Sequence, residues 1–132
     1  MYATRQDLID RYGEAEIAQR ESALPPGATD RALADADAEI DSYLAGRYVV
    51  PLAAPPGNVV RVACTIARAR LLGDAVSEQA RKDSEDARAW LRDVQAGRAL
   101  VAGASPQTAP ATSVATVNLT NGRDKAFAGG IQ

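Results

Sequence analysis

The chain has 132 residues, of which 15 are lysine or arginine and 17 are aspartate or glutamate, so the formal net charge is -2. This balance excludes a strongly basic protein, because non-specific DNA affinity comes from clustered cations that neutralise phosphates. The chain has no histidine and one cysteine. These counts remove the commonest general base and exclude a cysteine-based zinc site and an internal disulfide.

The first 27 residues predict two short helices and a rigid loop. Thr4 is typical of a helix N-cap, and the apolar stripe that follows ends at Gly13. A second short helix is expected over residues 14–21, around Ile17. The sequence Leu-Pro-Pro-Gly at residues 24–27 cannot continue a helix.

The next segment predicts a longer helix, followed by extended backbone. Thr29 or Asp30 is expected to cap the helix, and Gly46 to end it. Residues 48–52 combine β-branched residues with a proline, which favours an extended conformation. The helix has apolar residues at three- and four-residue steps, at Leu33, Ala36, Ile40, Tyr43 and Leu44.

Two further helices are expected in the second half of the chain. The first, Val59–Leu72, is capped by Asn58 and is apolar on nearly every side, so it should be central and buried. The second is capped by Ser77 and ends at Gly97, with a densely charged outer face. Its expected inner face consists of Ala80, Ser84, Ala87, Leu91 and Val94, with Trp90 beside it.

The composition changes after Arg98. No charged residue occurs over residues 99–122, and residues 102–116 are rich in Ala, Ser, Thr, Pro and Gly, which is typical of a flexible arm. A weak alternation over Val114–Leu119 could form a short strand. The sequence therefore predicts an all-α protein: a helical domain of about four helices over residues 1–98, with an extended C-terminal arm over residues 99–132.

No pattern in the chain points to catalysis. Glycine-rich phosphate-binding loops are absent, and the single Cys64 lies in an apolar run, where a buried thiol is expected. The start of the chain carries an acid early and has no apolar segment, unlike a secretory signal peptide, and no apolar run is long enough to cross a membrane. We therefore expect a protein of the cytosol that is not an enzyme and needs no cofactor or metal.

Four acids on the predicted helix before residue 46 form two pairs with helical spacing. Asp35 faces the same way as Glu39, and Asp37 the same way as Asp41. Each pair could hold a cation, but an acidic stripe that is solvated or faces a partner is the favoured interpretation. Like charges at this spacing repel. Arginines of the same or a neighbouring subunit would relieve this repulsion, and the candidates are Arg61, Arg68 and Arg70.

Several runs of residues resemble a family of Mu-like phage and prophage proteins. They are the opening run over residues 2–13, the run over residues 34–48 followed by Pro51-Leu52, the run over residues 62–71, and the pair Trp90-Leu91. The likeness covers roughly residues 1–100, and the order of the motifs is more specific than any one of them. This family looks like the helical head–tail connector (adaptor) proteins of long-tailed phages.

The resemblance implies a structural role in the virion neck, reached after assembly in the host cytoplasm. It implies a homo-oligomeric ring of about twelve subunits beneath the portal, which extends the DNA channel without sequence-specific binding and docks a neck or tail-completion protein. The alternative is a small helical nucleic-acid-binding factor for packaging or regulation. Its best recognition helix, over residues 59–72, is too apolar to lie in a groove.

Two sets of residues are expected to make contacts between proteins. Because the acidic stripe lacks basic residues at its own four-residue spacings, it should pair with arginines of an adjacent subunit. The predicted subunit interface comprises Asp35, Glu39, Asp41, Arg47, Arg68, Arg88 and Arg92. The arm should order on the portal or a neighbouring subunit. Its predicted docking residues are Val114, Val117, Leu119, Arg123, Lys125 and Phe127.

Overall fold

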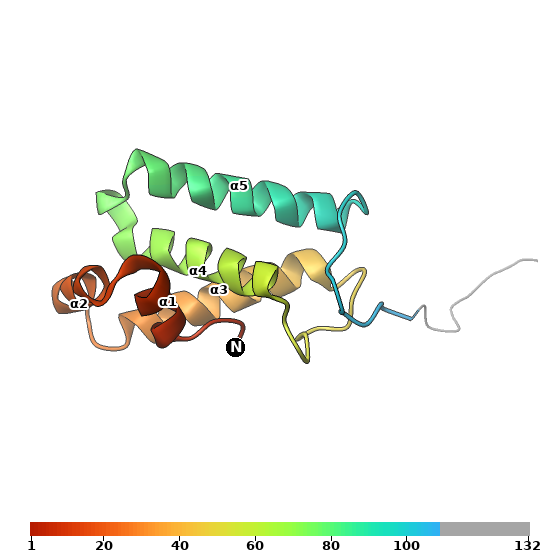
Figure 1. Cartoon of the computed structure of the whole chain (residues 1–132), viewed down its shortest axis with the longest axis horizontal. Coiled ribbons are helices and arrows are strands. Elements are labelled where there is room, and N and C mark those ends of the chain that lie inside the picture. Colours follow the sequence, from red (N-terminus) through yellow and green to blue (C-terminus); the bar gives the residue numbers. More distant parts are fainter. Residues whose placement is uncertain (109–132) are drawn as a thin grey trace, which may run out of the picture.

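The structure, a computed structural model, describes residues 1–108. Within this range the chain forms helices and turns and contains no sheet (Figure 1). The prediction of an all-α fold is confirmed. The elements in chain order are α1 (Arg5–Tyr12), α2 (Glu14–Ala23), α3 (Ala28–Leu44), α4 (Gly57–Leu72), the short 3-10 helix η1 (Gly73–Ala75) and α5 (Glu78–Gln95).

Helix α4 is the centre of the bundle, as its apolar sequence predicts. It packs against α3 on one side and α5 on the other, and α1 also contacts it (Figure 1). Most of its side chains are buried because neighbouring helices surround them. The six residues expected in the core all have exposed fractions of 0%: Ile40, Leu44, Cys64, Ile66, Leu91 and Val94.

Two helix starts follow the predicted capping chemistry. At α1, the Thr4 hydroxyl accepts the Asp7 N–H at 3.1 Å, and the Asp7 carboxylate accepts the Thr4 N–H at 2.9 Å. This reciprocal pair satisfies two N–H groups that the helix itself cannot. At α5, the Ser77 hydroxyl accepts the Ala80 N–H at 3.1 Å. The expected inner face of α5 is also confirmed, because all five of its residues are buried.

The two other predicted caps are wrong. Helix α3 begins at Ala28 after Gly27, whose φ of 82° is a left-handed value that favours glycine. Thr29 therefore lies inside the first turn, where its buried hydroxyl donates to Glu21 at 2.6 Å. Helix α4 begins at Gly57, so Asn58 lies within it and accepts hydrogen bonds from Arg61.

The segment after α5 crosses the end of the bundle and packs against it (Figure 1). Val101 is buried, and its N–H donates to the Tyr48 hydroxyl at 3.0 Å. An isolated antiparallel bridge joins Tyr48 to Pro106. Residues 99–107, expected to belong to the arm, therefore contact the helical body. The predicted boundary at residue 98 remains a prediction, and the predicted strand Val114–Leu119 lies outside the described residues.

No helix in the described part of the chain is long and apolar enough to span a membrane.

Candidate interaction surfaces

Glu39 on α3 lies between arginines of two other helices. Arg88 of α5 donates to its carboxylate twice, with Nε–Oε2 at 2.5 Å and Nη2–Oε1 at 3.2 Å. Arg70 of α4 donates at 3.1 Å. The hydrogen bonds from Arg88 lower the pKa of Glu39, burial opposes this, and Arg70 lowers it further. The carboxylate therefore ties α3 to α4 and α5.

The other acids of the predicted stripe also have partners within the chain. Asp35 lies 3.9 Å from Arg70 and its side chain is 62% exposed, so this ion pair is weak. Asp41 accepts a hydrogen bond from the Tyr2 hydroxyl, and Asp37 accepts the Tyr2 N–H at 3.0 Å. The stripe is not short of donors, because residues distant in sequence supply them.

The arginines of the predicted interface differ in their surroundings. Arg68 forms a two-point ion pair with Glu16 at 2.8 and 2.9 Å, and its guanidinium lies 4.3 Å from the centre of the Tyr12 ring. Arg47 donates to the Gln95 carbonyl at 2.7 Å. Arg92 is exposed and forms no ion pair within residues 1–108. Of the predicted arginines, Arg92 is thus the most available to another protein.

The premise for the predicted subunit interface therefore needs correction. Glu39 and Arg88, which were expected to meet across a subunit boundary, meet within one chain. Sequence spacing could not show this, because the two residues are 49 positions apart. Whether these residues also contact a neighbouring subunit remains a prediction. The predicted docking residues of the arm lie outside the described residues.

Tyr2 anchors the start of the chain, a role that the sequence did not reveal. Its ring is buried, and its hydroxyl donates to Asp41 while accepting the Leu52 N–H at 2.9 Å. Burial and the hydrogen bond to Asp41 raise the pKa of Tyr2 to about 12. One side chain thus links the N-terminus, α3 and the loop before α4.

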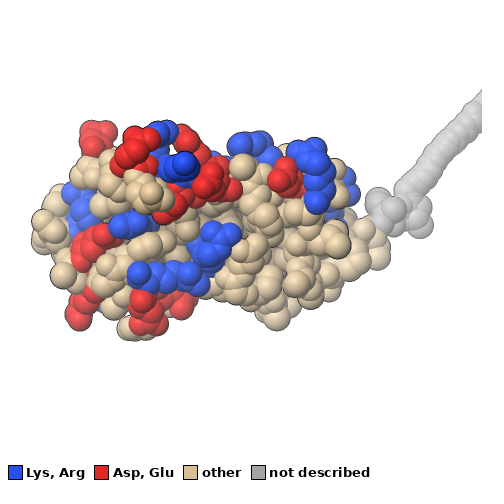
Figure 2. All heavy atoms as spheres, turned by 45° about the horizontal axis from the view of Figure 1, so that its top comes forward, with Lys and Arg blue, Asp and Glu red and all other residues tan. Residues whose placement is uncertain are grey.

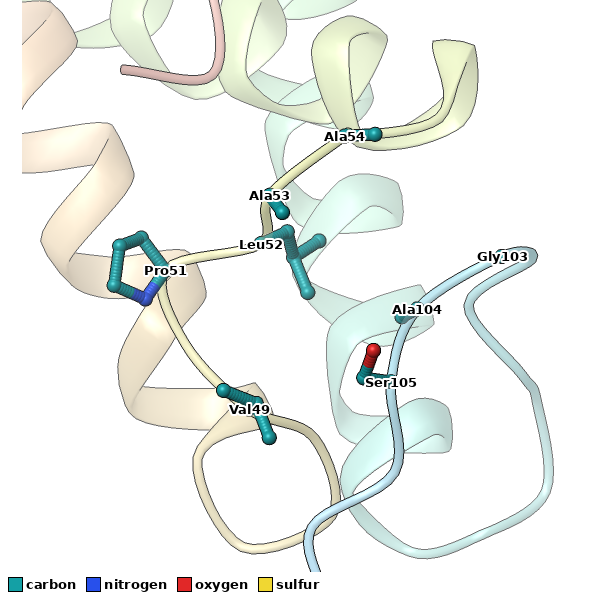
Figure 3. A pocket seen from close by; sticks show the side chains of 8 residues that line it. All are labelled: Val49, Pro51, Leu52, Ala53, Ala54, Gly103, Ala104 and Ser105. Atoms are coloured by element: carbon teal, nitrogen blue, oxygen red, sulfur yellow. The ribbon is translucent and has the colours of Figure 1, made fainter.

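One end of the bundle carries an uncharged surface. Residues 48–60 and 99–108 contain no charged side chain, and the backbone pairs them, with the Val49 N–H donating to the Ser105 carbonyl at 3.0 Å. Between them lies a groove of about 120 Å³ (Figure 3). Figure 2 shows uncharged surface at this end, below a group of basic side chains. The groove is lined by Val49, Pro51, Leu52, Ala53, Ala54, Gly103, Ala104 and Ser105.

A larger groove lies between the α2–α3 connection and the end of α4. Figure 1 shows these two segments at the other end of the bundle. Its volume is about 390 Å³. Its apolar lining is Leu24, Pro25, Ala28, Ala32 and Leu71, and its charged lining is Arg31, Asp35 and Arg70. An apolar depression with a few charged groups is suited to an apolar side chain of another protein.

The described residues contain no arrangement for metal binding and no exposed thiol. Within residues 1–108, no group of three His, Cys, Asp or Glu side chains is arranged to hold a metal ion. Cys64 is fully buried, and burial raises the pKa of its thiol, which disfavours the reactive thiolate.

Comparison with known proteins decides the family. The sequence model of a family described as "Bacteriophage Mu, Gp36" matches residues 2–119. The chain therefore belongs to the Mu Gp36 family. It is 39% identical over 102 residues to the "Mu-like prophage FluMu protein gp36" of Haemophilus influenzae, covering 74% of this chain and 72% of that protein. It is 35% identical over 103 residues to "Gene product J" of Escherichia phage Mu, covering 74% and 73%.

The match confirms the resemblance to Mu-like phage proteins. It includes the whole described body and reaches residue 119, so the Gp36 family also shares the first part of the predicted arm. The bundle, the Tyr2 anchor and the two grooves all lie within the matched residues.

Proposed function

We propose that this Gp36-family chain is a structural subunit of the virion neck: a head–tail connector, or adaptor. Its subunits would form a ring beneath the portal, extend the DNA channel and dock a neck or tail-completion protein. The observation that carries the proposal is the match to a phage Mu family over residues 2–119. The resemblance of the family to helical connectors supplies the place in the particle.

The distribution of polar groups supports a structural role. The carboxylates with lowered pKa values, Glu16, Glu21 and Glu39, are each bound to an arginine and in that way join separate helices. Perturbed carboxylates of an enzyme would instead be expected to converge on a substrate cleft. In this chain they stabilise the bundle.

The uncharged end supports docking. Desolvating charged groups is costly, so an uncharged surface with an apolar groove favours contact with another protein over contact with nucleic acid. The described part of the chain ends at Thr108, three residues after Ser105 of this groove. We propose that the groove lined by Val49 and Ser105, together with the arm residues beyond it, meets the portal or the next neck component.

The contacts of the α4 arginines speak against the alternative of a nucleic-acid-binding factor. The arginines of α4 that it would use are engaged within the chain: Arg61 with Asn58, Arg68 with Glu16, and Arg70 with Glu39. A protein that binds DNA through phosphates needs cations that remain available.

Sizing the full-length chain alone and after mixing with the portal protein of the same phage tests the proposal. We expect co-elution with the portal as a complex with several copies of the chain. A DNA mobility-shift assay serves as the second arm. A chain that fails to bind the portal but shifts DNA, with a steep loss at higher salt, would refute the connector role and support the alternative.

A further inference from the structure

Leu100 is the most exposed large apolar side chain among the described residues, with an exposed fraction of 80%. The segment after α5, which carries Leu100, lies at the end of the bundle opposite the α2–α3 connection (Figure 1), and the larger groove is beside that connection. Single exposed leucines are common on protein surfaces, so Leu100 points to a contact only together with a complementary surface elsewhere on the chain.

The backbone on both sides of Leu100 is fixed. Before it, the Arg98 and Ala99 N–H groups donate to the Asp93 carbonyl at 2.8 and 3.2 Å, which closes the end of α5. After it, Val101 is buried and bonded to the Tyr48 hydroxyl. The backbone that carries Leu100 is therefore already ordered, so binding through this side chain costs little further backbone entropy.

The larger groove at the opposite end has matching chemistry. Its apolar lining can accept a leucine side chain, and its volume of about 390 Å³ leaves room for one. Asp35 at this groove is 62% exposed and lies 3.9 Å from its arginine. Beside Leu100, Arg98 is 68% exposed and is bound to Asp93, which is 48% exposed. The groove also carries Arg31 and Arg70, so Asp35 is the charged group of its lining that can accept a hydrogen bond from a further arginine such as Arg98.

We infer that Leu100 of one subunit inserts into the groove of Ala28 and Leu71 on the next copy of this chain, with Arg98 placed against Asp35. This inference rests on the proposed ring. A ring of identical subunits needs two different, complementary surfaces on each subunit, and these surfaces must not coincide. Leu100 and the groove are different surfaces, an apolar side chain and an apolar depression, and they do not coincide, because the segment after α5 and the α2–α3 connection lie at opposite ends of the molecule (Figure 1).

Two single variants test the contact. Leu100→Asp removes the apolar side chain at an exposed site, and Ala28→Trp fills the groove at a half-buried one. Ala15→Asp, exposed near the start of α2, adds the same charge as the first variant outside the contact and is the matched control. Circular dichroism establishes that each variant is folded. Sedimentation of the full-length chain over a range of concentrations then measures self-association.

We expect the wild-type chain and Ala15→Asp to associate equally, and each contact variant to associate at least about tenfold more weakly. A mixture of the two contact variants should form dimers that grow no further. Leu100→Asp keeps its groove and Ala28→Trp keeps its leucine, so one intact contact remains per pair. The double variant should remain monomeric in every mixture.

Wild-type association by the Leu100→Asp variant, or a wild-type chain that stays monomeric at all concentrations, would overturn the inference. So would mixed contact variants that fail to pair. Portal binding is measured on the same samples and keeps the two claims apart. Variants that still assemble and bind the portal would refute this contact alone, whereas a wild-type chain without portal binding would refute the connector role.

Discussion

Glu39 of α3 and Arg88 of α5 form a two-point ion pair, with the closer nitrogen and oxygen 2.5 Å apart. The side chain of Glu39 is only 17% exposed and that of Arg88 31%, so the pair is partly shielded from solvent. With Arg70, it fixes the relative positions of the three longest helices. Part of the acidic stripe that suggested a subunit interface therefore stabilises the fold of a single subunit.

Loss of the Glu39 carboxylate should therefore destabilise the isolated subunit. We expect Glu39→Gln to lower the free energy of unfolding by about 1 kcal/mol, since the hydrogen bonds are charge-assisted but partly solvated. Asp35→Asn, one turn earlier and much more exposed, should cost less than about 0.5 kcal/mol. Urea unfolding measures both values. Equal losses at the two positions would show that the link between the helices contributes nothing.

The lowered pKa of Glu39 predicts how stability depends on pH. An unfolded glutamate titrates near 4.5, and the folded group titrates below that value. The ion pair therefore adds stability that is fully present above about pH 4.5 and is lost as the pH falls through the folded pKa. Unfolding free energies measured from neutral pH downward should decline less steeply for Glu39→Gln than for the wild-type chain. Parallel declines below pH 4.5 would contradict the assignment.

The local patterns in the sequence were sufficient to predict the helices and their buried faces. The inner face of α5 and the burial of α4 follow from residue periodicity, and the Thr4 and Ser77 caps follow from side-chain chemistry within three residues. The predicted start of α3 is wrong because Gly27, with a left-handed φ, begins the helix without a side-chain cap. Thr29 lies within the first turn and donates a hydrogen bond to Glu21. Local rules do not reveal which of two such starts is used.

Contacts between residues that are distant in the sequence could not be predicted from local patterns. The spacing of the acids on α3 predicted arginine partners from the same or a neighbouring subunit, with Arg70 among the candidates. It could not show that Arg88 of the same chain also binds Glu39. Tyr2 lies in a run that resembles the family, but nothing local indicates that its hydroxyl reaches Asp41 and Leu52. Neither groove could be predicted, because each combines segments that only the fold brings together.

Tyr2 predicts a second stability effect. Tyr2→Phe removes the hydroxyl that accepts the buried Leu52 N–H and donates to Asp41, leaving a polar group without a partner. We expect a loss of about 1–3 kcal/mol in unfolding free energy. Tyr12→Phe is the matched control, because the Tyr12 hydroxyl forms no hydrogen bond within residues 1–108. A Tyr2→Phe variant as stable as Tyr12→Phe would show that the anchor is unimportant.

A chain that stops after Thr108 tests the part of the arm over residues 109–132 by itself. It keeps the hydrogen bonds of Val49 to Ser105 and of Gln107 to Arg47, whereas a stop after Gly103 removes both. The chain that ends at Thr108 should retain the helical content and thermal midpoint of the full-length protein. It should lose portal binding. Full binding by this chain would show that the arm is dispensable and that docking uses the body alone.

The central claim, that this chain joins heads to tails, is tested most directly by electron microscopy of lysates from a phage or prophage that lacks its gene. We predict heads and complete tails that remain separate, with joining restored when the full-length chain is supplied. Intact, joined particles in the absence of the gene would contradict the account.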